Sequence, residues 1–501
     1  MFRKVLIANR GEIAIRIAQT LQQMGIRAVA VHSDADRRSP HVRVADEAYG
    51  LSGNASVETY LRGDKIIEIA RRAGAEAIHP GYGFLSENAT FAQACADAGL
   101  TFIGPRPEVV RLLGDKLAAK EACIKAGVPV VPGWAGDLDA PIETLKKEAK
   151  AIGYPILVKA AAGGGGKGMR IVERESELES AVAACQREAA SSFSDGRVFL
   201  EKYLTRPRHV EFQIFGDAHG NVVHLFEREC SIQRRYQKII EESPSPALTP
   251  DLRRRMGDAA VRIAAAVGYT NAGTVEFMLD ESGAFYFLEV NTRLQVEHPV
   301  TEEVTRQDLV RAQILVAAGA PLPFRQDELH QLGHALECRV YAEDPEKGFL
   351  PSTGRLRHYV PPVGPGIRVD GGVTQGSDVT VYYDPMLAKL TAWGRSREES
   401  IARMIWALER FVVMGVRTNV ELLRRIVGHR EFQAGRLHTR FLEEHGRALL
   451  DVEPVPDEAF LAAALAAAAP GGAAASAGDR RESSPALRLS PWMATGSWRA
   501  F

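Results

Sequence analysis

Residues 155–172, PILVKAAAGGGGKGMRIV, decide the fold of the central part of this chain. The apolar run 155–159 predicts a strand, a glycine-rich segment follows at 163–168, and 169–172 predicts a second strand. The glycines match G-x-G-x-x-G, but a helix follows a dinucleotide-binding loop, and a P-loop has Ser or Thr where this sequence has glycine after Lys167. We therefore predict a glycine hairpin that covers phosphate groups with backbone N–H groups and one lysine; a hairpin without a ligand is the alternative.

Two acidic side chains belong to a second predicted hairpin further along the chain. Residues 274–279 and 285–290 predict its strands. Glu276 on the first strand is expected beside Glu289 on the second, and Asn291 shares the face of Glu289 because side chains alternate along a strand. Carboxylate and amide oxygens are ligands that Mg²⁺ prefers. These three residues are therefore predicted metal ligands, with a solvated sheet edge as the alternative.

Polar groups are concentrated directly after this hairpin, at residues 291–298. Arg293 offers a planar fork that suits a carboxylate-like anion. Glu297 is a candidate general base, provided that the anions around it raise its pKa. A turn that caps a helix is the alternative interpretation of this segment.

Three lysines indicate a phosphate environment. Lys159 lies on the strand that leads into the glycines, Lys116 begins a predicted helix, and Lys238 follows a basic segment. A single lysine is usually a surface residue, but here several flank a glycine loop and an acidic pair. His209 is a candidate contact for ribose or phosphate, with a structural role as the alternative.

The N-terminal part predicts a parallel sheet. Residues 4–8 and 27–31 predict strands, and the segment 12–24 between them has apolar residues at the spacing of a helix. Further helices are expected at 86–98 and at 115–126, the second with an Asp cap. This order predicts an α/β fold with a doubly wound parallel sheet that carries helices on both faces.

Composition excludes several classes of protein. The 501 residues suggest about three domains. The net charge of −1 gives no reason to expect a nucleic-acid or membrane partner. The five cysteines form no CxxC pair, no apolar run reaches the length of a membrane span, and the short apolar run at the start does not predict a signal peptide. We therefore expect a reduced, cytoplasmic setting.

The C-terminal third changes in character. Short strands are expected after about residue 330, followed by helices at 398–411 and 419–426. Residues 451–487 are rich in Ala, Gly, Pro and Ser and predict a flexible linker.

Five sequence blocks, taken together in this order, resemble biotin carboxylases, the ATP-grasp component of biotin-dependent acyl-CoA carboxylases. The blocks are 7–14, 79–88, Lys159 with 163–169, 228–235 and 289–301, and the resemblance extends over about 1–446. It implies an N-terminal domain, a central ATP-grasp domain with a mobile lid, and a C-terminal mixed β-rich domain. The implied boundaries are 1–114, 115–320 with the lid at about 131–203, and 330–446, then a linker at 447–487 and a tail at 488–501 that resembles the start of a bridging segment in long α subunits.

The resemblance also implies a reaction. MgATP phosphorylates bicarbonate to carboxyphosphate, and the carbon dioxide that this intermediate releases is captured by the ureido nitrogen of biotin. Glu297 would deprotonate bicarbonate, and Arg339 would stabilise the biotin enolate. Tyr236 departs from the pattern, because the best-known bacterial members have His at this position.

The implied site residues form three sets. ATP would be bound by Lys116, Lys159, Gly164, Gly165, Gly166, Met169, Glu201, Lys202, Leu204, His209, Gln233, Tyr236, Glu276 and Glu289. Bicarbonate and biotin would be bound by Lys238, Arg293, Gln295, Val296, Glu297 and Arg339, among which Lys238, Arg293, Glu297 and Arg339 would be catalytic. Two metal ions, Mg²⁺ or Mn²⁺, would be held by Glu276, Glu289 and Asn291.

The implied partners follow from a missing motif. The biotin attachment motif of the family, a Lys between two Met, is absent, so biotin is expected on a separate carrier protein or domain. A carboxyltransferase subunit and a homodimer are further expectations. We expect the first half-reaction of an acetyl-CoA or propionyl-CoA carboxylase, with a role in fatty acid biosynthesis. A methylcrotonyl-CoA or pyruvate carboxylase, another ATP-grasp ligase, and a degenerate scaffold subunit are the alternatives.

Overall fold

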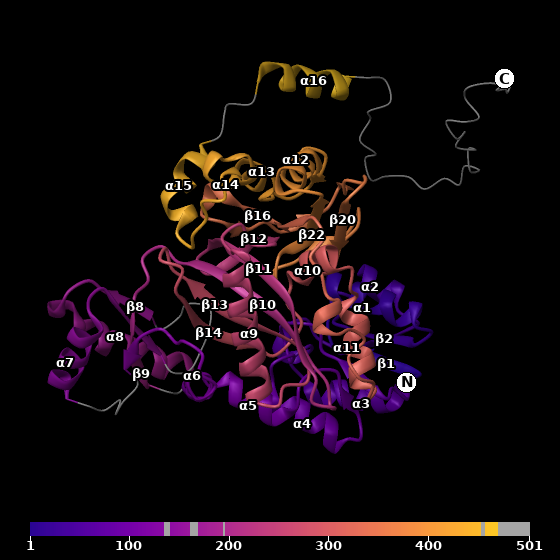
Figure 1. Cartoon of the computed structure of the whole chain (residues 1–501). Helices are drawn as coiled ribbons and strands as arrows, with labels where there is room; N and C mark the ends of the chain where they lie inside the picture. Colours follow the sequence, from indigo (N-terminus) through magenta and orange to yellow (C-terminus); the bar gives the residue numbers. More distant parts are fainter. Residues whose placement is uncertain (135–140, 161–168, 194–195, 452–455, 469–501) are drawn as a thin grey trace, which may run out of the picture. The chain divides into compact units, whose positions relative to one another are not determined.

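A computed structural model describes residues 1–134, 141–160, 169–193, 196–451 and 456–468 (Figure 1). The chain forms two compact units, Met1–Leu450 and Asp451–Phe501. Most of the predicted glycine hairpin, residues 161–168, and the predicted tail at 488–501 lie outside the described residues.

The N-terminal sheet is parallel, as predicted. Its strands follow the order β3-β2-β1-β4-β5. Successive residues of β1 alternate between two hydrophobic clusters: Val5 packs with Ile17 of α1, whereas Leu6 packs with Ile66 of α3. Helices therefore cover both faces of the sheet. The elements are β1 (Lys4–Ile7), α1 (Gly11–Gln23), β2 (Arg27–His32), α2 (Pro40–Val44), β3 (Glu47–Gly50), α3 (Gly63–Ala73), β4 (Ala77–His79), α4 (Ala89–Asp97), β5 (Thr101–Phe102) and α5 (Pro107–Gly114).

The helix predicted at 86–98 is shorter than expected. It begins at Ala89, because the Asn88 side chain caps it by accepting a hydrogen bond from the Phe91 N–H. The residues before the cap form a turn instead, in which the Ser86 N–H donates to the Gly83 carbonyl oxygen. The helix predicted at 115–126 is confirmed as α6 (Lys116–Lys125), capped by Asp115.

A four-stranded antiparallel sheet forms the predicted lid region, with strand order β6-β9-β7-β8. The register places Lys159 at the end of β7 opposite Met169 at the start of β8, so two paired strands flank the glycine segment as predicted. Figure 1 shows α7 and α8 gathered around these strands. The elements are β6 (Gly133–Trp134), α7 (Ile142–Ile152), β7 (Ile156–Ala160), β8 (Met169–Val172), α8 (Leu178–Phe193) and β9 (Val198–Lys202).

One eight-stranded sheet runs through the rest of the first unit, in the order β14-β13-β10-β11-β12-β15-β22-β20. The hairpin predicted at 274–279 and 285–290 is confirmed in it as β13–β14, and β10 and β11 form a second hairpin. Its strands are β10 (Arg208–Gly216), β11 (Val222–Arg234), β12 (Gln237–Ser243), β13 (Asn271–Leu279), β14 (Phe285–Asn291), β15 (His334–Tyr341), β20 (Ile367–Gly371) and β22 (Met386–Gly394).

The expected boundary between residues 320 and 330 does not divide this sheet. β12 belongs to the expected ATP-grasp domain and β15 to the expected C-terminal domain, yet the two strands pair. The pairing is favourable because it leaves β12 without an open edge of unsatisfied backbone groups, and every residue of β15 is buried. The two domains are therefore parts of one continuous sheet.

Helices cover the two halves of this sheet separately. Ile263 of α9 packs on Phe212 and Phe277, and Met404 of α12 packs with Leu336 and Leu390. Figure 1 shows α12 to α15 together over the part of the sheet that contains β12 and β22. The helices are α9 (Pro250–Ala266), α10 (His298–Thr305), α11 (Leu309–Ala317), α12 (Arg397–Leu408), α13 (Val420–Gly428), α14 (Arg430–Gln433) and α15 (Phe441–Leu450).

The flexible linker predicted at 447–487 is wrong for part of its length. Residues 447–450 complete α15, and α16 (Asp457–Ala468) forms a further helix in the second unit. Alanine has the highest helix propensity, and the acidic side chains of Asp457 and Glu458 favour the first turn. A composition rich in alanine therefore indicates a helix wherever glycine and proline are absent.

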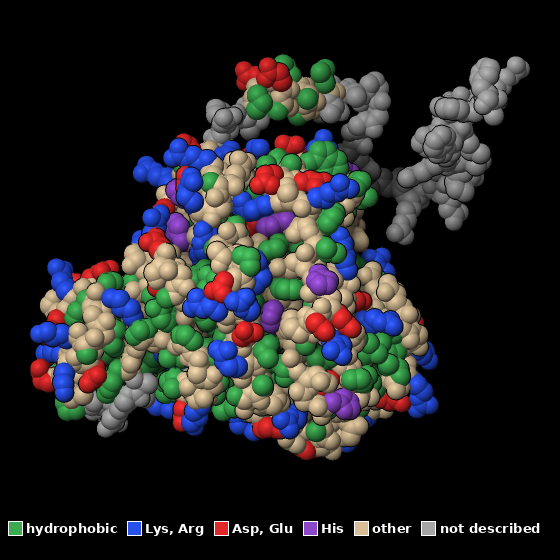
Figure 2. Space-filling view, in the orientation of Figure 1, with side chains coloured by type: hydrophobic (Ala, Val, Ile, Leu, Met, Phe, Trp, Pro, Cys, Tyr) green, Lys and Arg blue, Asp and Glu red, His purple; other side chains and the backbone are tan. Residues whose placement is uncertain are grey.

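The surface and the cysteines agree with the composition. Lys and Arg side chains are interspersed with Asp and Glu on the face shown in Figure 2. All five cysteines are free and buried. Within the described residues, no helix has the length and apolarity needed to cross a membrane.

Close packing at one glycine gives a test of the central sheet. A Cβ atom on Gly216, the last residue of β10, would lie 2.1 Å from the carbonyl oxygen of Tyr269. We expect Gly216→Ala to lower the free energy of unfolding by about 2 kcal/mol, seen as a lower thermal midpoint. Gly428→Ala is the matched control, because a Cβ there meets no described atom within 4 Å. Equal midpoints for the two variants would contradict this packing.

Candidate active site

A row of ionisable side chains crosses the eight-stranded sheet from strand to strand. Glu276 on β13 lies opposite Glu289 on β14 and, on its other side, opposite Glu211 on β10. Arg228 on β11 is the next partner of Glu211. The row continues with Lys238 on β12, Arg339 on β15 and Lys389 on β22. Acidic groups thus gather toward one end of the row and basic groups toward the other, which suits a site for both a cation and an anion.

The ammonium group of Lys238 lies among three carboxylates. Its Nζ donates to Glu276 Oε1 at 2.8 Å, to Glu297 Oε1 at 2.7 Å, and also to Glu211. Burial opposes the charge of Lys238, but the three carboxylates outweigh burial and raise its pKa well above the ordinary value. Lys238 therefore contacts three neighbouring buried carboxylates, of which Glu211 also binds Arg228 and Glu297 also binds Arg339.

Glu297 lies between two cations. Its Oε1 accepts from Lys238, and its Oε2 accepts from Arg339 Nη2 at 2.9 Å. Burial alone would raise the pKa of Glu297, but the charges of Lys238, Arg339 and Arg228 lower it well below the ordinary value. A pKa raised by neighbouring anions, the condition for a general base at this position, is therefore not met in this structure. The cations hold Glu297 ionised and at the same time weaken it as a base.

Arg339 is fixed by a second buried carboxylate. Its Nε donates to Glu241 Oε1 at 2.6 Å. Burial raises the pKa of Glu241 to about 7, although Arg339 opposes this shift. The guanidinium of Arg339 therefore spans Glu241 and Glu297 and cannot turn freely.

Arg293 joins a planar network beside Lys238. Its Nε donates to Glu87 Oε2 at 2.8 Å, its Nη1 to Gln295 Oε1 at 2.7 Å, and its Nη2 to Asn291 Oδ1 at 3.0 Å. Both amides in turn donate to Glu276 Oε1, Asn291 at 2.8 Å and Gln295 at 3.2 Å. The amide oxygen of Asn291, a predicted metal ligand, therefore accepts from Arg293 in this state.

The predicted metal pair Glu276 and Glu289 has opposite pKa shifts. Burial opposes the charge of Glu276, but Lys238 and His209 outweigh it and lower its pKa. Burial and the negative charge of Glu276 raise the pKa of Glu289, and Lys116 offsets this only in part. A bound divalent cation would relieve this repulsion, so the donor set fits Mg²⁺ or Mn²⁺.

Two other groups of possible ligands occur among the described residues. The ligand atoms of His209, Glu211 and Glu276 lie within 4.8 Å of one another, and so do those of Glu211, Cys230 and Glu297. Glu211 and Glu297 already bind Arg228 or Lys238. Glu276 also binds Lys238, so Glu289, whose pKa burial and Glu276 raise, is the carboxylate that gains most from a metal ion beside this pair.

Lys116 at the start of α6 and Lys159 on the lid strand β7 lie near the buried carboxylates of Glu201 and Glu289. Lys159 on β7 donates to Glu201 Oε2 on β9 at 2.8 Å, and Lys120 of α6 binds the other oxygen. Burial and the charge of Lys159 lower the pKa of Lys116, while Glu289 and Glu201 oppose this effect. These groups therefore share one neighbourhood, where two cations face an acidic pair, as a nucleotide phosphate chain requires.

The other predicted nucleotide residues of the lid have different positions. Lys202 Nζ donates to the carbonyl oxygens of Gly153 at 2.8 Å and Tyr154 at 3.2 Å, so its charge stabilises the lid itself. The N–H of Leu204, just after β9, takes no part in the backbone hydrogen bonds between described residues. Gly164, Gly165 and Gly166 lie outside the described residues.

Gln233 and Tyr236 lie at opposite extremes of burial. Gln233 is buried and its Nε2 lies 2.9 Å from His209 Nδ1, and His209 Nε2 lies 3.0 Å from Glu276 Oε2. Gln233 thus orients a side chain at the metal pair. Tyr236 is 63% exposed in the turn between β11 and β12 and lies outside this buried network.

Sequence reasoning missed several members of the network. Glu211 lies two residues after His209 on one strand, a spacing that places both on one face and could have indicated it. Arg228 is fully buried and binds Glu211 Oε1 at 2.6 Å, Gln213 and Thr301. Glu241 and Glu87 carry no such signal, because each has its partner on a distant strand or loop.

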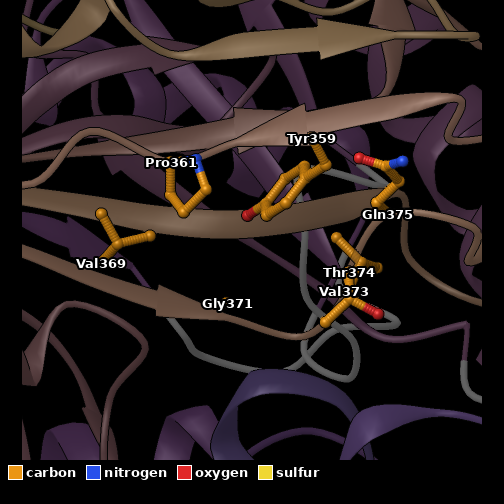
Figure 3. A pocket seen from close by; sticks show the side chains of 7 residues that line it. All are labelled: Tyr359, Pro361, Val369, Gly371, Val373, Thr374 and Gln375. Atoms are coloured by element: carbon orange, nitrogen blue, oxygen red, sulfur yellow. The ribbon is translucent and has the colours of Figure 1, made fainter. Parts of the chain in front are cut away.

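A separate cavity contains no comparable chemistry. It has a volume of about 300 Å³ and lies between β19 (His358–Val360) and β20, as Figure 3 shows. Its lining consists of Tyr359, Pro361, Val369, Gly371, Val373, Thr374 and Gln375. Because none of these side chains is charged, the cavity is not the candidate active site.

Comparisons with known proteins agree along the chain. Sequence profiles match residues 1–110 as the N-terminal domain of biotin carboxylase, 115–325 as the ATP-binding domain of the carbamoyl-phosphate synthase L chain, and 337–444 as the C-terminal domain of biotin carboxylase.

Three similar proteins share about half of their residues with this chain. The mitochondrial methylcrotonoyl-CoA carboxylase subunit α of Dictyostelium discoideum is 50% identical over 498 residues, 99% of this chain and 70% of that protein. The biotin carboxylase of a Nostoc species is 51% identical over 443 residues, 88% of this chain and 99% of that protein. The biotin carboxylase domain dimer of Hydrogenobacter thermophilus 2-oxoglutarate carboxylase, in complex with MgADP, ADP and bicarbonate, has a TM-score of 0.87 and 48% identity, covering 91% of this chain and 100% of that one. The chain spans 60 to 70% of the length of the methylcrotonoyl-CoA carboxylase α subunits that it matches.

The position of Lys238 predicts a stability that depends on pH. In Lys238→Met, three buried carboxylates lose their cation, so we expect a loss of about 3 kcal/mol at pH 8. The lowered pKa values of Glu276 and Glu297 stabilise the wild type fully above their ordinary pKa of 4.5, so this contribution is the same at pH 8 and at pH 5. In the variant, protonation relieves the repulsion. The difference in thermal midpoint should therefore narrow from pH 8 to pH 5.

Lys65→Met is the matched control for this experiment. Lys65 Nζ donates to the carbonyl oxygens of Leu51 at 2.7 Å and Glu58 at 2.8 Å, which do not titrate. The loss of stability in Lys65→Met should therefore hardly change with pH. A loss in Lys238→Met that is the same at every pH would contradict the arrangement of charges.

Proposed function

The chain belongs to the biotin carboxylase family of ATP-grasp enzymes, and from this premise we propose a role for each group in its buried charge network. It is an ATP-dependent ligase, and ATP, bicarbonate and biotin are its substrates, with Mg²⁺ as the metal ion. The observation that carries the assignment is the convergence of Lys238, Arg293, Glu297 and Arg339 beside the carboxylates Glu276 and Glu289.

Bicarbonate is bound between Arg293 and Lys238. The fork of Arg293 suits a planar carboxylate-like anion, and Gln295 supplies a neighbouring amide. The N–H of Val296 takes no part in the backbone hydrogen bonds between described residues. Lys389 Nζ donates to the Val296 carbonyl oxygen at 2.8 Å and so fixes this stretch of backbone. These groups form a preorganised site for one small anion.

Glu297 is the general base. It takes the hydroxyl proton of bicarbonate, and a bicarbonate oxygen then attacks the γ-phosphorus of ATP while ADP leaves. The product, carboxyphosphate, breaks down to carbon dioxide and phosphate. Lys238 compensates the charge that gathers beside Glu297, because it already binds this carboxylate at 2.7 Å.

Arg339 serves the second half of the reaction. It binds Glu297 at 2.9 Å and is held by Glu241, so its position follows that of the base. The phosphate released from carboxyphosphate takes the ureido N–H proton of biotin, Arg339 stabilises the enolate that results, and its nitrogen attacks carbon dioxide. The base and the enolate-stabilising group are therefore coupled through one ion pair.

Glu276 and Glu289, with Asn291, hold the metal ion, and a second metal ion is part of the proposal. The opposite pKa shifts of the two carboxylates support this assignment, because one of them lacks a compensating charge. When bound, Mg²⁺ neutralises charge on the phosphate oxygens during transfer. Lys116, Lys159 and His209 bind phosphate oxygens around it.

The lid region at 131–203 excludes water from the intermediate. Carboxyphosphate is labile, so its breakdown must occur away from bulk solvent. The lid carries Lys159 and the glycine segment, and its closure over the nucleotide would place both beside the phosphates. The N–H of Leu204 is proposed to contact the adenine base, and Glu201 and Lys202 to form its surroundings.

Replacement of the base tests the proposal. Glu297→Gln keeps the shape of the side chain but removes the acceptor, so bicarbonate-dependent ATP turnover with free biotin should fall about 100-fold or more. The dissociation constant for MgATP should stay within about twofold of the wild type, measured by calorimetry. Glu303→Gln, on the same helix but outside the network, is the control.

Three outcomes would contradict the assignment. Unchanged turnover in Glu297→Gln would show that Glu297 is not the general base. Wild-type turnover that needs a different acid and ignores biotin would favour another ATP-grasp ligase. Binding of MgATP without any bicarbonate-dependent turnover would favour a degenerate scaffold.

A second part of the proposal concerns the partners of the chain and the final acceptor of the carboxyl group. We infer a biotin carrier, a carboxyltransferase and a homodimer, and the Hydrogenobacter domain is a dimer in its structure. The expected role in fatty acid biosynthesis has no specific support. The matched α subunits favour methylcrotonoyl-CoA as the final acceptor, which was one of the alternatives. The cytoplasmic setting stays a prediction, since that relative is mitochondrial.

Competition between acyl acceptors tests the proposed identity of the final acceptor. The complex purified with its carrier and carboxyltransferase should transfer labelled carbon from bicarbonate to methylcrotonoyl-CoA about tenfold faster, in kcat/KM, than to acetyl-CoA, propionyl-CoA or pyruvate. Faster transfer to any of the other three would overturn the acceptor while leaving the biotin carboxylase reaction in place.

A further inference from the structure

One acidic side chain of the N-terminal part reaches the proposed bicarbonate site. Glu87 lies in the turn before α4, and both of its carboxylate oxygens are used there. Oε2 accepts from Arg293 Nε at 2.8 Å, and Oε1 accepts from the Thr292 backbone N–H at 3.2 Å. Glu87 therefore fixes both the side chain of Arg293 and the backbone that carries it.

The geometry of the guanidinium makes this contact informative. Glu87 takes the N–H of Nε, so the two terminal nitrogens of Arg293 remain for the proposed anion site, where they now contact Asn291 and Gln295. An arginine side chain has several rotatable bonds, and an anchor at Nε selects the orientation of its fork. Glu87 therefore binds Arg293 at a different nitrogen from the two that contact these amides.

The turn that presents Glu87 is held from several directions. Asn9 Nδ2 donates to the carbonyl oxygens of Pro80 at 2.8 Å and Tyr82 at 2.7 Å. The ring of Phe84 stacks on Tyr60 with their centroids 4.9 Å apart. Asn88, next to Glu87, caps α4. A carboxylate on such a rigid support can position its partner within narrow limits.

The two side chains of this ion pair differ in burial, since Arg293 is more buried than Glu87. Desolvation opposes the charge of Arg293, but the charge of Glu87 and its hydrogen bond outweigh burial, together with Glu297 and Glu276, and raise the pKa of this guanidinium. The Glu87 side chain itself is 42% exposed, so a substitution there leaves no large cavity. The effect of removing its charge can therefore be measured in a folded protein.

We propose that Glu87 is a positioning residue for bicarbonate, which acts by aiming the fork of Arg293 without touching the substrate. The proposal rests on the proposed function, because it takes Arg293 as the bicarbonate ligand. It assigns the N-terminal block 79–88 a purpose in catalysis, although this block contributes no catalytic group of its own. Asn9 thus holds the turn that carries Glu87, and Glu87 in turn binds Arg293.

Two substitutions separate positioning from folding. Glu87→Gln can still accept from Arg293 but loses the charge, whereas Glu87→Ala loses both. We expect the KM for bicarbonate to rise about threefold in Glu87→Gln and about tenfold or more in Glu87→Ala. The KM for MgATP, and the thermal midpoint, should stay close to wild type. An equilibrium titration of the MgADP-bound enzyme with bicarbonate should show the same order of affinities.

Glu76→Gln is the matched control, because Glu76 also binds an arginine of the N-terminal part, Arg3 at 3.1 Å, but lies away from the site. A bicarbonate KM within twofold of wild type in Glu87→Ala would overturn the proposal. So would an equal rise in the KM for MgATP or a large fall in the thermal midpoint, since Glu87 would then be a general tie between domains. A wild-type enzyme without bicarbonate-dependent turnover would contradict the proposed function instead.

Discussion

The ion pairs of Lys238 are the interaction on which the site depends. One ammonium group binds Glu211, Glu276 and Glu297, which belong to two strands and one loop, and Arg228 and Arg339 add their charges to the first and the last of these. Buried carboxylates at this spacing would repel one another and take up protons without it. With it, Glu297 stays an ionised base, and Glu276 stays an ionised metal ligand. Lys238 thus contacts both the proposed metal site, at Glu276, and the proposed bicarbonate site, at Glu297.

The continuous sheet explains how distant segments reach this cation. Glu211, Glu276 and Lys238 lie on strands of the ATP-grasp part, whereas Arg339 lies on β15 of the C-terminal part. The pairing of β12 with β15 carries Arg339 to Glu297. The N-terminal sheet adds Glu87 through a rigid turn. The ATP-grasp part therefore supplies most of this small polar centre, and the N-terminal and C-terminal parts complete it with Glu87 and Arg339.

Local sequence patterns predicted much of this structure. The strand pattern identified the hairpin β13–β14, and the position of two carboxylates on it identified Glu276 and Glu289 as a pair. Long-range pairing was not visible: nothing near β12 indicates that β15 completes its edge, or that Arg228 and Glu241 become partners of buried groups. The condition set for Glu297 as a base, a pKa raised by neighbouring anions, is not met, because residues 228, 238 and 339 place cations around it. Composition failed at α16, where alanine favours a helix over a linker.

The most direct test follows one oxygen atom. If Glu297 prepares bicarbonate to attack ATP, an oxygen of bicarbonate must become an oxygen of the released phosphate. The enzyme would be given bicarbonate labelled with oxygen-18, MgATP and free biotin in unlabelled water, and the phosphate analysed by mass spectrometry before the label exchanges. The account predicts a single labelled oxygen in each phosphate formed. Unlabelled phosphate under these conditions, with label appearing only when the water is labelled, would show that water attacks ATP and would contradict it.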